Sequence, residues 1–134
     1  MTQESTDVEV KRVVDDDGNL IEESHYKNGV LHGKRTLWSS DGVKLGESEY
    51  LNGKLHGRCL LWNAKGQKTL GARYENGKHH GPYTSWWDNG NKKEEGNYES
   101  GERVGKYYWY SEDGSLLSEH DYSAQSVYTS RAQK

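Results

Sequence analysis

The chain repeats itself every 24 residues, and this period restricts its fold more than any other feature. Each of the first four repeated tyrosines is followed by glycines at offsets 3, 7 and 16, and by another aromatic residue at offset 12. The tyrosines are Tyr26, Tyr50, Tyr74, Tyr98 and Tyr122, and the residues at offset 12 are Trp38, Trp62, Trp86 and Tyr110. A fixed period of this length indicates stacked repeats, each of which packs on its neighbours.

Two turn signals in every unit predict β-hairpins. Asn-Gly, or Ser-Gly in the last full unit, lies just after the repeated tyrosine, and a second glycine turn follows half a unit later. Asn-Gly is the strongest short hairpin signal, and no segment shows helical periodicity. We therefore expect ten antiparallel strands, near residues 8–15, 19–26, 32–39, 43–50, 56–63, 67–74, 80–87, 91–98, 104–111 and 115–122.

These patterns predict an all-β fold, an elongated single-layer antiparallel β-meander of stacked 24-residue hairpin repeats. The repeat sheet is expected over residues 8–122, with a partial unit at 8–25 and full units at 26–49, 50–73, 74–97 and 98–121. Residues 1–7 are expected to form a disordered tail. Residues 123–134, where the period is lost, are expected to form a C-terminal cap or tail, since terminal repeats are usually atypical.

The composition favours a thin core. Only 31% of the residues are hydrophobic, but the chain has five Trp and ten Tyr and no Phe. Each Trp or Tyr can bury roughly 150–250 Å² while its polar atom stays in water. The chain can therefore fold around thin aromatic layers.

The register follows from the turns. If both turns are three-residue loops that end in a left-handed glycine, the repeated tyrosines, the repeated tryptophans and most small residues share one face. Tyr50 then lies opposite His32, and Trp38 opposite Lys44. A slip of one residue would exchange the faces, so we choose the register that gathers the aromatic residues. The second face then carries Leu37, Leu45, Leu61, Tyr83, Trp87, Tyr107 and Trp109.

Four aromatic residues of the second face are not required by the repeat, namely Tyr83, Trp87, Tyr107 and Trp109. Trp and Tyr are enriched in interaction hot spots, so these four are our hypothesis for a partner-binding patch. The alternative is that they pack beneath the C-terminal tail.

Metal binding and catalysis find little support. His32, His56 and His80 recur, but their units lie roughly 9–10 Å apart, too far for one zinc ion, so we expect them to stack against the repeated tyrosines. The sequence has no nucleophile elbow, P-loop or HExxH. We expect no catalytic residue, no metal, no cofactor and no enzyme activity.

The recurring Tyr-x-Asn-Gly-x-x-His-Gly, as in Tyr50 to Gly57, resembles the MORN repeat, and more closely the bacterial MORN-variant repeat, whose proteins are often classed as antitoxin-like. The resemblance covers residues 8–122. It implies an elongated, twisted sheet of hairpins and a non-catalytic role in scaffolding or partner binding.

We therefore expect a protein–protein interaction or scaffold module, with the antitoxin of a toxin–antitoxin pair as one form and a homodimer as another. A ligand-binding aromatic ladder of glycan or cell-wall type is the alternative. The net charge is −3 with no basic cluster, which argues against nucleic acid and against anionic lipid. Cys59 is the single cysteine, and no signal peptide is visible, so we expect a cytoplasmic location.

Overall fold

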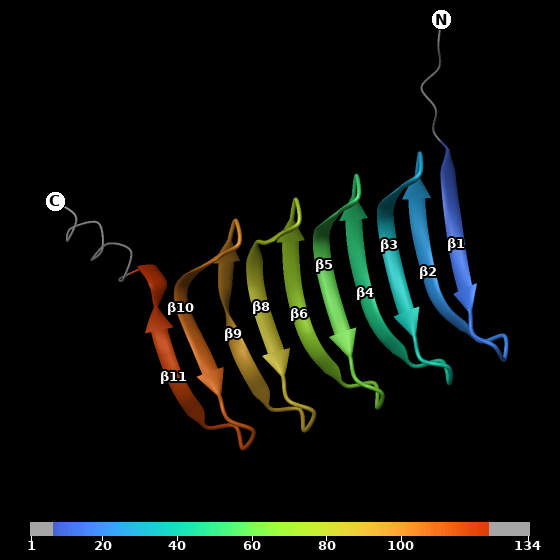
Figure 1. Cartoon of the computed structure of the whole chain (residues 1–134). Helices are drawn as coiled ribbons and strands as arrows, with labels where there is room; N and C mark the ends of the chain where they lie inside the picture. The colour runs from blue at the N-terminus through green and yellow to red at the C-terminus, as the bar shows by residue number, and fades with distance from the viewer. Residues whose placement is uncertain (1–6, 124–134) are drawn as a thin grey trace, which may run out of the picture.

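The computed structural model describes residues 7–123. They form one open antiparallel sheet in which the strands lie side by side in the order of the chain (Figure 1). This confirms the predicted all-β, single-layer meander. The strands are β1 (Val8–Val14), β2 (Leu20–Lys27), β3 (Val30–Trp38), β4 (Lys44–Leu51), β5 (Lys54–Trp62), β6 (Lys68–Glu75), β7 (Lys78–His79), β8 (Gly81–Trp86), β9 (Lys92–Glu99), β10 (Glu102–Tyr110) and β11 (Leu116–Asp121).

The ten predicted arms are present, because β7 and β8 together form one arm that pairs with β6 on both sides of His80. The tail predicted at 1–7 and the cap predicted at 123–134 lie outside the described residues, except for residues 7 and 123.

One of the two predicted turn types is right and the other is wrong. Gly42 has a φ of 88° and donates its N–H to Ser39 O at 3.0 Å, which closes the expected three-residue loop. The Asn-Gly turns are shorter. Asn28 and Gly29 both have positive φ, 51° and 83°, and their neighbours pair directly, so these turns have two residues. Two successive left-handed residues match the twist of the flanking strands, which favours the tighter turn.

The shorter turn, with bulges in the strands, changes which residues share a face. Across β3 and β4 the pairs are Gly33 with Tyr50, Arg35 with Ser48, and Leu37 with Gly46. Cross-strand partners share a face, and successive residues alternate, so Tyr50 and Leu37 lie on one face and Trp38 on the other. The prediction that the repeated tyrosines and tryptophans share a face is therefore wrong. Tyr50 lies opposite Gly33, whereas the pairing of Trp38 with Lys44 is confirmed.

We call the two surfaces the tyrosine face and the tryptophan face. On the tryptophan face, Trp86 approaches Gly71 together with Leu60. The tyrosine face carries the repeated tyrosines and also most residues that were expected on the opposite surface: Leu37, Leu61, Tyr83, Tyr107 and Trp109.

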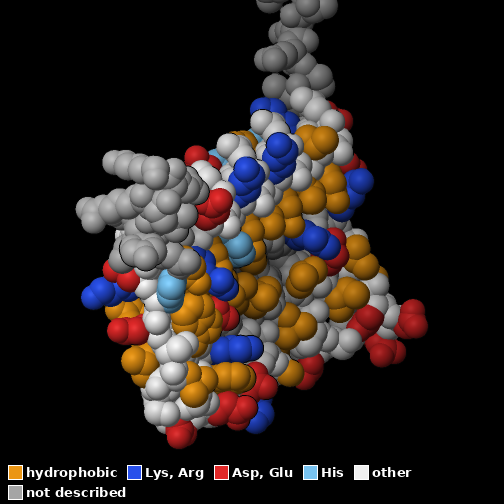
Figure 2. Space-filling model, turned by 60° about the vertical axis from the view of Figure 1, so that its left-hand side comes forward, with side chains coloured by type: hydrophobic (Ala, Val, Ile, Leu, Met, Phe, Trp, Pro, Cys, Tyr) orange, Lys and Arg blue, Asp and Glu red, His pale blue; other side chains and the backbone are white. Residues whose placement is uncertain are grey.

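The core is thin, as the composition predicts. Among the described residues the buried hydrophobic side chains are Ala72 and Tyr107, and both lie on the tyrosine face. An open sheet of one layer leaves many hydrophobic atoms at the surface, and Figure 2 shows them gathered across the strands between charged side chains. Stability therefore comes from contacts between neighbouring strands rather than from a closed interior.

Each later Asn-Gly or Ser-Gly turn is hydrogen-bonded to the unit before it. His32 Nδ1 accepts a hydrogen bond from Asn52 N at 3.4 Å, and Gly53 N donates to Leu31 O at 2.8 Å. The same two bonds recur for His56 with Asn76 and Leu55 with Gly77, and for His80 with Ser100 and His79 with Gly101. The repeated histidines thus clamp turns, and the expected stacking against the tyrosines is wrong. It is His79 that stacks on a repeated tyrosine, with its ring centroid 4.7 Å from that of Tyr98.

Candidate functional site

The C-terminal half of the tyrosine face holds a cluster of aromatic rings. Tyr107 is 0% exposed and lies at its centre, with ring centroids 4.8 Å from Trp109, 6.0 Å from Tyr98 and 6.5 Å from Tyr83. Gly96 lies between Tyr83 and Tyr107, and its lack of a side chain makes room for the Tyr107 ring. The rings therefore brace one another across β8, β9 and β10.

Charged groups fix the orientation of the cluster. Tyr107 Oη donates a hydrogen bond to Glu94 Oε1 at 3.0 Å, and the Arg103 guanidinium lies over Tyr107 and Trp109 at 4.8 and 5.6 Å. Burial, with the hydrogen bonds to Tyr98 and Glu94, raises the pKa of Tyr107 well above its usual value. Burial, followed by the charge of Glu94, also raises the pKa of Tyr83. Both phenols stay protonated at neutral pH, and that of Tyr107 donates its hydrogen bond to Glu94.

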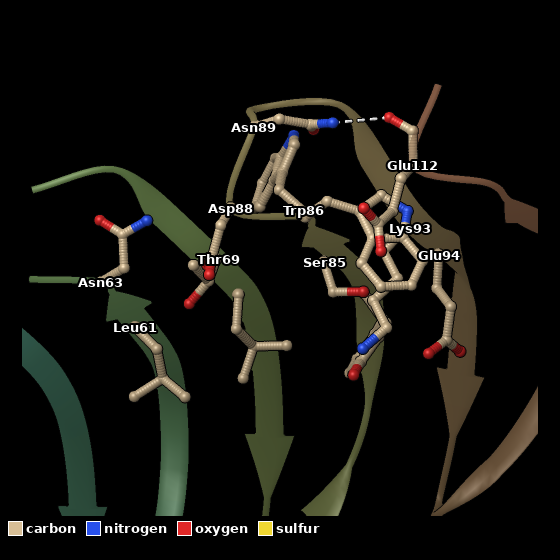
Figure 3. Close-up of a pocket in the computed structure, with 13 residues that line it drawn as sticks. Leu61, Asn63, Thr69, Ser85, Trp86, Asp88, Asn89, Lys93, Glu94 and Glu112 are labelled. Carbon is tan, nitrogen blue, oxygen red and sulfur yellow. Dashed lines mark hydrogen bonds between the residues drawn. The ribbon is translucent and has the colours of Figure 1, made fainter. Parts of the chain in front are cut away.

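A hollow of about 720 Å³ opens beside this cluster, and Ser85 forms part of its lining (Figure 3). The row of side chains across the strands here runs Leu61, Leu70, Ser85, Glu94, Trp109. In the two preceding units the position of Ser85 is held by Leu37 and Leu61. A serine at a leucine position leaves the space that the hollow occupies.

The Ser85 hydroxyl is unusual as well. Ser85 is 7% exposed, and its buried Oγ makes no well-formed hydrogen bond, with the Tyr83 phenol as its weakly bonded neighbour. Leaving a buried hydroxyl without a good partner costs free energy. The hollow therefore combines missing volume with a poorly paired polar atom, and both would be compensated by a group that enters it.

Trp87 lines the same hollow from the loop after β8. At this loop position Asp15, Ser39 and Asn63 use a side-chain oxygen to accept a backbone N–H of their own turn. Trp87 has no such oxygen. Its indole N–H donates to Tyr110 O at 3.2 Å, and Lys93 Nζ lies 4.7 Å from the ring centroid. In this unit Asn89 Oδ1 accepts the equivalent backbone N–H, from Asn91 at 2.9 Å, so the turn stays capped while Trp87 places an indole at the rim.

The structure brings three predicted site residues together, Tyr83, Tyr107 and Trp109, while Trp87 lies at the loop end of the same face. Since Tyr107 is fully buried, it can serve a binding surface only by supporting its neighbours. Sequence reasoning missed Ser85 and Glu94. Ser85 could have been found as a departure from the repeated leucine, a signal as clear as the non-repeated aromatics.

Other kinds of site find no support in the described part of the chain. Residues 7–123 contain no group of three His, Cys, Asp or Glu side chains placed to hold a metal ion. In the same range no helix is long and apolar enough to cross a bilayer. Cys59 is half-buried, and burial raises the pKa of its thiol, which makes it a weak nucleophile.

The fold is a single open sheet of stacked hairpin repeats. Residues 12–28, 80–100 and 103–124 match the MORN repeat variant family, and this similarity supports a MORN-repeat protein. The 24-residue period continues unchanged through the residues between them. MORN repeats are generally modules for interaction with proteins or membranes and are not enzymes. No curated protein matches the chain.

Proposed function

We propose that this chain is a protein-interaction module that takes a side chain of its partner into the hollow at Ser85. The observation that carries the proposal is a buried serine where the two preceding units have leucine, which opens space beside the aromatic cluster. Since this departure weakens the packing of the sheet, we interpret it as a binding feature.

The lining suits a protein side chain. Tyr83, Trp87 and Leu70 supply hydrophobic walls. The charged residues of the lining are the basic Lys93 and the acidic Asp88, Glu94 and Glu112. Hot spots of protein interfaces are commonly an anchor side chain in such a pocket, surrounded by polar residues. The mixed charges also argue against an anionic lipid surface as the occupant.

The test compares two substitutions at one position. Ser85→Leu restores the residue of the neighbouring units and fills the hollow, whereas Ser85→Ala removes the hydroxyl and leaves the space open. A partner captured by the wild type is identified, purified and titrated against each variant. We expect Ser85→Leu to reduce affinity at least about tenfold, with an unfolding temperature equal to or above that of the wild type. Undiminished binding of the partner to Ser85→Leu would refute the proposal.

A second matched pair addresses Trp87. Trp87→Asn and Ser39→Asn place the same residue at the same loop position of two units, and asparagine can cap the turn in both. We expect only Trp87→Asn to weaken partner binding. Equal losses from both would mean that the loops act through stability rather than contact.

The identity of the partner is a finer proposal. A toxin neutralised by a cytoplasmic antitoxin is one candidate, tested by whether co-expression of this chain relieves the toxicity of the captured protein. The ligand alternatives are tested by titrating tryptophan fluorescence with oligosaccharides, muropeptides or anionic vesicles. A saturable shift with one of these, removed by Ser85→Leu, would replace the protein partner with that ligand.

A further inference from the structure

We infer that copies of this chain associate end to end, with β11 of one copy pairing antiparallel to β1 of the next. This interaction surface is separate from the hollow, because it lies at the two edges of the sheet (Figure 1). Within residues 7–123, β1 and β11 each pair with a single strand, β2 and β10.

Exposed aliphatic side chains gather on these two strands. Nine large hydrophobic residues are exposed in the described part of the chain, and six of them lie on β1 or β11. They are Val8, Val10, Val13 and Val14 on β1, and Leu116 and Leu117 on β11. All seven residues of β1 are exposed. Exposed apolar edge strands are templates for pairing with another chain.

The repeat itself supplies the register. β1 stands 24 residues before β3, and β11 stands 24 residues after β9. Placing β1 of a second copy beside β11 therefore reproduces the antiparallel pairing of β9 with β10. In the structure Glu94 pairs with Trp109 and Glu95 with Tyr108. One unit later, Ser118 and Glu119 hold the positions of Glu94 and Glu95, and in the second copy Val13 and Arg12 hold the positions of Trp109 and Tyr108. Ser118 therefore lies opposite Val13, and Glu119 opposite Arg12. The second copy continues the sheet without a change of strand direction or spacing.

The charges favour this pairing over pairing of like edges. β1 carries Lys11 and Arg12 with one acidic residue, whereas β11 carries Glu119 and Asp121 and no Lys or Arg. Arg12 bonds Glu23 on its inner side at 2.9 Å, and its side chain is still 61% exposed. Opposite charges facing across strands stabilise a pair, and like charges destabilise it. Two β1 strands or two β11 strands would repel each other, while β1 and β11 attract.

An interface between two different surfaces leaves one free edge at each end of the dimer. Such a heterologous contact continues into longer assemblies unless the rotation closes a ring. The expected product is therefore a series of dimers, trimers and longer chains that grows with protein concentration. A closed dimer is the product expected of a face-to-face contact.

The test is a charge exchange followed by sedimentation equilibrium of the full chain over a range of concentrations. Arg12→Glu and Glu119→Arg each place like charges in the proposed interface, and we expect each to associate about tenfold more weakly than the wild type. Mixing the two variants, or combining both changes in one chain, restores opposite charges and is expected to restore association. Arg58→Glu makes the same charge change on β5, away from the edges, and is expected to leave association unchanged.

Unfolding curves of all variants show whether they stay folded, and exposed charge changes are expected to alter stability little. A wild type that stays monomeric at the highest concentration would overturn the inference. So would association that survives both single substitutions, or single losses that mixing does not restore.

Discussion

Replacing Gly96 by alanine is expected to displace the Tyr107 ring. A β-carbon built on Gly96 lies 2.6 Å from Tyr107 Cε2 and 2.8 Å from Tyr107 Cγ, and closer still to Cδ2, which is far inside van der Waals contact. These atoms belong to the near side of a ring that is 0% exposed. The ring cannot swing aside as the end of a flexible side chain can.

The expected magnitude follows from two routes. Expelling the ring would expose roughly 150–250 Å², which at about 25 cal/mol per Å² is ~4–6 kcal/mol. Keeping it in a strained position costs ~1–3 kcal/mol, and disturbing its hydrogen bond to Glu94 about 1 kcal/mol more. The conformation with the smaller cost is the one populated, so we expect the free energy of unfolding to fall by about 3 kcal/mol. For a domain of this size that lowers the unfolding temperature by roughly 10 °C.

Urea and thermal unfolding, followed by tryptophan fluorescence, measure this loss, and Gly71→Ala is the matched control. A β-carbon on Gly71 meets Leu60 and Trp86 at 3.8 Å, an ordinary contact, so its effect is expected within about 0.5 kcal/mol. The double variant Gly96→Ala/Tyr107→Ala should be as stable as Tyr107→Ala alone, because without the Tyr107 ring the added β-carbon has nothing to clash with. A Gly96→Ala protein as stable as the Gly71→Ala control, or fully additive losses in the double variant, would refute the reasoning.

Three further predictions concern the hydrogen bonds and titrating groups. His56→Ala removes the acceptor for Asn76 N, so we expect a loss of about 0.5–1 kcal/mol and faster hydrogen exchange at the Asn76 amide, and an unchanged exchange rate would contradict the clamp. Burial lowers the pKa of His79, so below about pH 6.5 the unfolded chain binds more protons than the folded chain, and the stability that neutral His79 supplies is lost as the pH falls. His79→Leu should therefore lose less stability than the wild type between pH 7 and 5, measured by urea unfolding. An equal loss in both proteins would count against this effect. The hydrogen bond to Glu95 raises the pKa of Tyr110 to about 12, so Glu95→Gln should move the alkaline titration of the Tyr110 ring, followed by NMR, towards pH 10, and no movement would exclude that cause.

Much of the fold could be predicted because the repeat states the same information several times. The arms, the antiparallel order and the single layer followed from turn residues and spacing. The assignment of faces failed because a bulge adds a residue without leaving a mark in the pattern of hydrophobicity. The register shift between Leu37 and Trp38 changes the face of every residue beyond it, and neither residue type signals it.

The candidate site was half accessible to sequence reasoning. Tyr83, Trp87 and Trp109 stood out as aromatic residues that the repeat does not need, and they gather at one end of the tyrosine face. The hollow arises because Ser85 is smaller than the leucine of the two preceding units. A small residue at one position is a weaker sequence signal than an additional tryptophan. Tyr107 was expected in the partner-binding patch because the repeat does not require it. It is instead the most deeply buried hydrophobic side chain among the described residues, which sequence alone could not show.

The turn clamps give the folding of this sheet a direction. Each histidine clamp joins a turn to a histidine 20 residues earlier in the chain. A unit can therefore dock as soon as it has been synthesised, because the surface that receives it already exists. Contacts that are short in sequence allow rapid folding. During synthesis the sheet can therefore grow from the N-terminal hairpin, and damage to an early clamp is expected to delay the unit that docks on it.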